Sequence, residues 1–162
     1  MNILSLDQAT TTGIAVFKNS ELIFYDLHKS PRDKKDKKYT QEDKIELLLD
    51  KIKELIKEYN IDFVVFEDVQ SQKSPTTYKF LSILMGCIRQ ELYRLSIPYE
   101  VLPCVSWRSI LGIKGKGRDV LKKKAQEYIL NKYGIEINSD IADAICIGIA
   151  YIKRKNIYMR YK

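Results

Sequence analysis

Several features that the sequence lacks argue against whole classes of protein before any motif is considered. No run approaches the roughly 18 consecutive apolar residues of a membrane-spanning helix, and the N-terminus enters a strand-like run without the pattern of a signal peptide. The three cysteines, Cys87, Cys104 and Cys146, are widely spaced and odd in number, which argues against a disulfide framework or a zinc cluster. The single histidine, His28, is predicted to lie on the surface and to bind no metal. We therefore expect a cytoplasmic protein with no membrane partner.

Acidic side chains are outnumbered by basic ones. The 162 residues include 28 Lys and Arg against 21 Asp and Glu, which gives a formal net charge of +7. This excess favours a polyanionic partner, nucleic acid first and a membrane surface second, although a basic protein that binds neither has the same composition. The length suits one domain with a full core, and neither a linker nor a repeat divides the chain. Residues 1–162 are therefore predicted to form one domain.

The spacing of apolar residues predicts an α/β fold. Short runs rich in β-branched and aromatic residues, bounded by turns, predict strands at 2–7, 13–17, 21–27, 61–66 and 98–102. Apolar residues at helical spacing predict helices at 41–59, 75–95, 105–111, 119–132 and 139–151. The first three strands follow one another through short turns and should be antiparallel. The helix at 41–59 makes a crossover, so the strand at 61–66 should lie parallel to the first.

Three helix starts have recognisable caps. Thr40 and Asp43 have the spacing of a capping box, Asp119 is placed to cap the helix that follows it, and Ser139 is the expected N-cap of the last helix. Trp107 is interpreted as a residue that fills the core.

Four acidic residues stand at the ends of predicted elements. Asp7 ends the first strand and Glu67 ends the strand at 61–66, so both reach the sheet edge where open α/β folds place their sites. Asp140 and Asp143 share one face of the first turn of an almost wholly apolar helix. Taken singly, a turn-capping role explains Asp7, and the helix dipole explains the two aspartates.

Taken together, the four carboxylates favour a metal site. Gathered within a few ångströms, they would repel one another and raise each other's pKa unless cations compensated them. Hard oxygen ligands suit Mg²⁺ or Mn²⁺, and two such ions about 4 Å apart are typical of phosphodiester cleavage. A general acid–base pair, as in a glycosidase, needs only two carboxylates and leaves the basic excess unexplained.

Basic residues that could bind phosphate gather between 108 and 124. The loop at 112–118 combines glycines with lysines, but the GxxxxGK[ST] spacing of a Walker A loop is absent. The charge run at 29–38 and the basic residues at 153–155 could also follow DNA arms, and solvated surface explains them equally well. The basic residues chosen as DNA contacts are Arg108, Lys114, Lys116, Arg118, Lys122 and Lys123.

The order of elements and four motifs resemble the RuvC family of Holliday junction resolvases, in the RNase H/retroviral integrase superfamily. The resemblance covers essentially the whole chain, and the short, lysine-rich sequence is most similar to RuvC-like enzymes of phages of low-GC Gram-positive hosts. It implies an RNase H-like fold with a mixed five-stranded sheet flanked by helices. The motifs are the strand ending at Asp7, Phe66–Val69, Leu111–Ile113 and Asp140–Ala144.

The resemblance also implies an activity. Family members are homodimers that place paired, symmetric nicks across a four-way junction, and two Mg²⁺ ions per active site are expected here, with Mn²⁺ as a substitute. Arg118 falls where the family often has a lysine near the scissile phosphate. The helix at 75–95 could supply the dimer interface through Leu81, Met85 and Ile88, although core packing explains these three residues about as well. The implied catalytic residues, which are also the implied metal ligands, are Asp7, Glu67, Asp140 and Asp143.

The chain departs from the family at three places. Gln8 and Ala9 replace a Pro-Gly turn, and Trp107 replaces another family lysine. Gln70, which we count among the DNA-contacting residues, stands where bacterial members carry an aromatic wedge. These changes predict relaxed specificity, with three-way junctions, forks or flaps cut as well. Two alternatives remain: an RNA-processing nuclease of the same superfamily and a non-catalytic scaffold that binds branched DNA.

Overall fold

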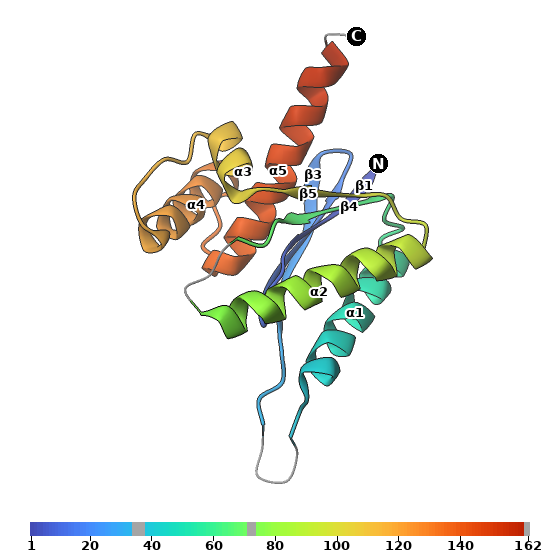
Figure 1. The fold of residues 1–162 in the computed structure, drawn as a ribbon. Coiled ribbons are helices and arrows are strands. Elements are labelled where there is room, and N and C mark those ends of the chain that lie inside the picture. Colours follow the sequence, from blue (N-terminus) through green and yellow to red (C-terminus); the bar gives the residue numbers. More distant parts are fainter. Residues whose placement is uncertain (34–37, 71–73, 161–162) are drawn as a thin grey trace.

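The computed structural model describes residues 1–33, 38–70 and 74–160, with a five-stranded sheet at the centre (Figure 1). The strand order is β3-β2-β1-β4-β5. β1 pairs antiparallel with β2 and parallel with β4, β2 pairs antiparallel with β3, and β4 pairs parallel with β5. The predicted mixed sheet, with three antiparallel strands followed by two parallel ones, is confirmed. The strands are β1 (Asn2–Asp7), β2 (Thr11–Lys18), β3 (Glu21–Lys29), β4 (Phe63–Glu67) and β5 (Tyr99–Leu102).

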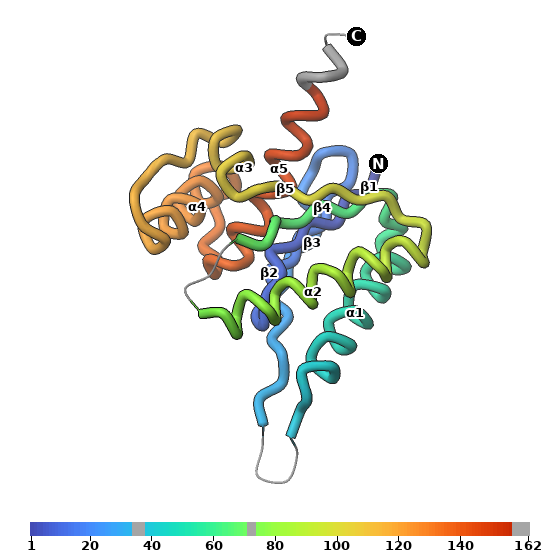
Figure 2. Tube along the Cα trace, viewed as in Figure 1, coloured from blue at the N-terminus to red at the C-terminus, as the bar shows by residue number. Residues whose placement is uncertain are grey.

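Helices cover both faces of the sheet. Figures 1 and 2 show α1 and α2 on one face and α3, α4 and α5 on the other. Each face buries its own apolar cluster against these helices. In the part of the chain that the structure describes, no helix is long and apolar enough to cross a membrane. The helices are α1 (Gln41–Glu58), α2 (Pro75–Arg94), α3 (Cys104–Leu111), α4 (Arg118–Tyr133) and α5 (Ser139–Arg160).

The alternation of side chains along β1 and β4 decides which face receives the acidic strand ends. Leu6 of β1 and Phe66 of β4 are partners in the parallel register, and both pack in the cluster beneath α1 and α2. Successive side chains of a strand point to opposite faces. Asp7 and Glu67, each one residue further on, therefore belong to the face that α5 covers.

Two predicted helix caps differ from the observed ones. The capping box of Thr40 and Asp43 is confirmed. At α5, however, Asn138 rather than Ser139 is the cap, because its Oδ1 accepts a 2.7 Å bond from the Asp140 N–H and its carbonyl accepts from Ala142. At α4, Asp119 lies inside the helix, whose N-cap is Gly117 without a side-chain bond.

Two element boundaries also differ from prediction. β3 continues to Lys29, so His28 lies within the strand, where it is half-buried and its pKa is lowered mainly by burial. α5 continues beyond residue 151 to Arg160, so the basic residues at 153–155 form part of a helix and not a tail. In that helix Arg154 forms an ion pair with Glu100 of β5.

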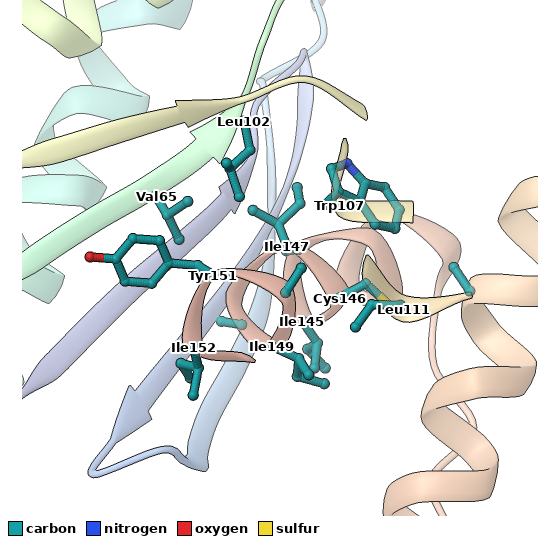
Figure 3. Packing of buried hydrophobic residues seen from close by; sticks show 14 of the residues in the cluster. Val65, Leu102, Trp107, Leu111, Ile145, Cys146, Ile147, Ile149, Tyr151 and Ile152 are labelled. Atoms are coloured by element: carbon teal, nitrogen blue, oxygen red, sulfur yellow. The ribbon is translucent and has the colours of Figure 1, made fainter. Parts of the chain in front are cut away.

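The packing of α5 on the sheet fixes the position of its N-terminus. Figure 3 shows its apolar side chains meeting Val65, Leu102 and Trp107. The Tyr151 ring stacks on Phe63 with 4.7 Å between ring centroids. Nearer the helix start, Ser5 of β1 donates a buried 2.7 Å hydrogen bond to the Ala144 carbonyl. These contacts hold the first turn of α5 above the ends of the strands.

Gly13 of β2 allows this close approach, which yields a first prediction. A Cβ atom at Gly13 would lie 1.9 Å from the backbone oxygen of Asp140. We expect Gly13→Ala to lower the free energy of unfolding by about 3 kcal/mol, because backbone cannot yield as a side-chain end can. Chemical denaturation measures the change.

The matched control for this prediction is Gly86→Ala in α2. None of the described atoms lies within 4 Å of a Cβ at Gly86, so this variant should gain up to about 1 kcal/mol from helix propensity. Equal stability of the Gly13 and Gly86 variants would contradict the proposed contact between β2 and α5.

Candidate active site

A cavity of about 530 Å³ lies at the carboxyl ends of β1 and β4, beside the first turn of α5. Its wall is completed by the N-terminal part of α2, by α3 and by the start of α4. All four acidic residues selected from the sequence line it: Asp7, Glu67, Asp140 and Asp143.

The two strand-end carboxylates are held by groups from neighbouring segments. The Gln8 side chain is buried and donates a hydrogen bond to the Glu67 backbone carbonyl, which ties the end of β1 to the end of β4. The turn between β1 and β2 is closed by Thr12, whose hydroxyl donates a 2.7 Å bond to the Ala9 carbonyl. The Glu67 carboxylate accepts a 3.0 Å bond from the indole N–H of Trp107. The turn between β1 and β2 is therefore held by its own hydrogen bonds.

The two helical aspartates share one lysine. Lys122 of α4 forms an ion pair with Asp140 and places its Nζ 3.7 Å from Asp143 Oδ2. Asp143 is only 3% exposed, and its Oδ1 has no hydrogen-bond partner among the described residues. A buried carboxylate oxygen without a partner is costly in a folded protein. A cation or a hydrogen-bond donor beside Asp143 Oδ1 would therefore stabilise this carboxylate.

Burial and mutual repulsion raise the pKa of three of the carboxylates. Burial raises the pKa of Asp7 well above its ordinary value, and the charges of Glu67 and Asp143 raise it further. Burial also raises the pKa of Glu67, against the bond from Trp107, which lowers it. Burial raises the pKa of Asp143 to about 6. Burial, with a smaller contribution from the neighbouring carboxylates, therefore disfavours the charged form of these three groups.

The same carboxylates affect the pKa of Lys122. Burial alone lowers its pKa, but the hydrogen bond to Asp140 and the charges of Asp143 and Asp7 outweigh burial and raise it overall. The raised pKa keeps the Lys122 ammonium charged among the carboxylates.

The donor set suits a hard divalent cation, although the present side-chain positions do not enclose one. Across residues 1–33, 38–70 and 74–160, no three His, Cys, Asp or Glu side chains are close enough together to hold an ion. Lys122 instead pairs with the two helical aspartates. The candidate ligands are nonetheless all oxygens, which a hard divalent ion prefers. Such an ion would also give the buried Asp143 Oδ1 a partner and lower the raised pKa of Asp7.

The predicted DNA-contacting residues fall into two groups. Those that line the cavity are Gln70, Arg108, Arg118 and Lys122. Those that are exposed outside it, on the α3–α4 loop and on α4, are Lys114, Lys116 and Lys123. Of the charge run at 29–38, residues 34–37 lie outside the described part of the chain.

Sequence reasoning missed two contacts within the site. It assigned Trp107 to the core and Lys122 to DNA, whereas the first also binds Glu67 and the second also pairs with Asp140 and Asp143. The signal for Trp107 was available, because a buried indole N–H usually finds a hydrogen-bond acceptor. The partner of Lys122 depends on how α4 packs on α5, which its sequence pattern does not specify.

The strand order and the helices on both faces define an RNase H-like fold. Among solved structures, T. thermophilus RuvC in complex with a Holliday junction substrate is similar at a TM-score of 0.77 and 11% identity, over 97% of this chain and 96% of that chain. Another structure of Thermus thermophilus RuvC has a TM-score of 0.70 and 13% identity over the same shares of the two chains. The yeast mitochondrial Holliday junction resolvase Ydc2 has a TM-score of 0.65 and 14% identity, over 98% of this chain and 80% of that chain. No family model and no curated protein matches the sequence.

Proposed function

We propose that this protein is a divalent-metal-dependent endonuclease that resolves branched DNA by paired nicks. The observation that carries the proposal is the cavity lined by four carboxylates from β1, β4 and α5. It is supported by a fold similar to that of Holliday junction resolvases and by a net charge of +7. We take residues 1–162 as one nuclease domain.

Seven residues that line the cavity have proposed roles. When bound, two Mg²⁺ ions, or Mn²⁺ in their place, supply water activation and charge stabilisation for phosphodiester hydrolysis. Arg108 and Arg118 line the cavity and would hold the scissile phosphate by its oxygens. Lys122 would exchange its aspartate partners for phosphate once the cavity charge is compensated. The residues that would hold the ions are Asp7, Glu67, Asp140 and Asp143.

Branched DNA is the proposed substrate because the fold is similar to that of Holliday junction resolvases and because the basic residues continue beyond the cavity. Lys114, Lys116 and Lys123 are exposed on the α3–α4 loop and on α4, and they would follow the phosphates of a DNA arm. Gln70 lines the cavity and donates a 2.7 Å hydrogen bond to Cys104 Sγ. Its amide side chain has no aromatic ring that could stack on a base. We therefore propose relaxed selectivity that includes three-way junctions and forks. Because the short, lysine-rich sequence resembles RuvC-like enzymes of phages, we propose a phage-encoded enzyme that acts in the bacterial cytoplasm.

A cleavage panel tests the function. Purified protein is incubated with a synthetic four-way junction, a replication fork and an RNA hairpin, with Mg²⁺ or with EDTA. We expect metal-dependent nicks in the junction and the fork and none in the RNA. Cleavage of RNA alone would favour the RNA-processing alternative, and binding of the junction without any cleavage would favour the scaffold. Cleavage confined to one sequence of a mobile four-way junction, with forks intact, would contradict the relaxed selectivity.

The proposed homodimer requires different residues from those first selected. Ile88 is fully buried in the core beneath α2, so it is wrong as an interface residue. Met85 is half-buried against the same core, and Leu81 lines the cavity. The solvent side of α2 instead exposes Ile83 to 39% and Tyr93 to 79%. These two residues are ten apart, which separates them by about 80° around the helix axis, so both lie on the solvent side but not in one line. We propose that two copies pair through this side of α2.

The dimer prediction has a matched control. Ile83→Asp should convert the dimer to a monomer, because a charge would be buried at the centre of the proposed interface. Leu130 of α4 is 41% exposed on the opposite face of the sheet, so Leu130→Asp should leave the dimer intact. Light scattering coupled to size-exclusion chromatography measures the mass. Two variants of equal mass would exclude this side of α2.

A further inference from the structure

Trp107, the only tryptophan of the chain, lies in α3 between the core and the cavity. Its ring is fully buried and packs with α5 residues such as Ile147 in the cluster of Figure 3. Its Nε1–H donates a 3.0 Å hydrogen bond to Oε2 of Glu67. One side chain therefore joins the packed core to a carboxylate of the cavity.

The neighbouring residue, Arg108, uses the same indole. Its guanidinium carbon lies 4.7 Å from the centroid of the Trp107 ring, within the range of a cation–π contact. Arg108 also lines the cavity, and its buried Nε has no hydrogen-bond partner in the described ranges. The charge of Arg108 lowers the pKa of Glu67, so the guanidinium acts on the same carboxylate. The Glu67 carboxylate thus lies at the edge of the indole, and the Arg108 guanidinium lies over its face.

We propose that Trp107 is a positioning residue that orients the Glu67 carboxylate for a divalent ion and the Arg108 guanidinium for the substrate phosphate. This inference rests on the proposed function, because it assigns the residue a role within that site. An indole N–H can only donate, so it fixes Glu67 Oε2 as an acceptor and leaves Oε1 for the ion. Hydrogen-bond partners of this kind orient ligands and tune the affinity of metal sites.

A role in packing alone makes a different prediction. Trp107→Phe keeps an apolar ring and a face for Arg108, and it removes the N–H donor. If Trp107 only fills the core, this variant should lose stability and nothing else. If it positions Glu67, the folded variant should also bind metal more weakly. Phe17→Leu supplies the control, since Phe17 is buried in the same cluster and does not line the cavity.

The first measurement is Mn²⁺ affinity, followed by electron paramagnetic resonance of the free ion at a temperature where all proteins are folded. We expect Trp107→Phe to weaken binding by about tenfold or more, and Phe17→Leu to bind as the parent does. Equal affinity of Trp107→Phe and the parent would overturn the positioning role and leave the nuclease proposal intact. A parent that binds no Mn²⁺ would overturn both.

The second measurement observes the indole directly. A chain with one tryptophan gives one indole N–H signal in a ¹H–¹⁵N spectrum. We expect that signal to move in Glu67→Gln, because a neutral amide oxygen is a weaker acceptor than a carboxylate. We also expect Mg²⁺ to move it in the parent protein and to leave it unchanged in Glu67→Gln. A signal that is the same in both proteins and in both conditions would overturn the proposal.

Discussion

Asp7→Asn is expected to abolish cleavage of a four-way junction while binding of the same junction is retained or strengthened. The carboxylate of Asp7 lies among Glu67, Asp140 and Asp143 in the cavity. Removing one proposed ligand should reduce cleavage by more than a hundredfold, since loss of residues that merely support metal ligands costs 10–100-fold. Binding should not weaken, because the variant removes a negative charge that faces phosphate.

The change is measured by single-turnover cleavage beside a gel-shift titration of an uncut junction in Ca²⁺. Asp50→Asn is the control, because Asp50 lies on α1 at the other face of the sheet and is exposed. It should cleave like the parent. An Asp7→Asn protein that nicks at the parental rate would show that the site has been assigned to the wrong residues.

Asp143→Asn is expected to stabilise the metal-free protein at pH 8. Burial raises the pKa of Asp143 to about 6, above the value of about 3.9 expected in the unfolded chain. The folded state therefore binds this proton more tightly. The associated stability is fully present below pH 4 and is lost as the pH rises through 6. An uncharged Asn avoids that loss, and the gain at pH 8 should be on the order of 2 kcal/mol.

Thermal unfolding at a series of pH values measures this effect. The melting temperature of Asp143→Asn should exceed that of the parent at pH 8 and approach it at pH 4. Mg²⁺ at pH 8 should raise the melting temperature of the parent and have little effect on the variant. Asp50→Asn should show neither difference. A parent that is more stable than Asp143→Asn at pH 8 without metal would mean that Lys122 fully compensates the buried charge.

The sequence predicted the sheet well because its signals were local. Strand-like runs ending on Asp7 and Glu67, with a crossover helix between them, were enough to place parallel strands side by side. The alternation along each strand then directs both carboxylates to one face. The element boundaries were predicted less accurately, because Asn138 and Ser139 are both good caps and only the backbone conformation selects between them.

The contacts within the site were beyond local patterns. Lys122 is one of three consecutive lysines, and only the packing of α4 against α5 selects it to meet Asp140 and Asp143. Trp107 is forty residues from Glu67, and its N–H could have met any acceptor at the edge of the core. Side-chain partners over such distances in sequence are fixed by tertiary structure, which periodicity does not encode.

The most direct test of the metal site is a crystal of the protein soaked in Mn²⁺ and measured for anomalous scattering. We predict anomalous peaks among the four carboxylates, with the Lys122 ammonium moved away from Asp140 and Asp143. A well-ordered cavity without an anomalous peak, in which Lys122 still pairs with both aspartates, would contradict the account.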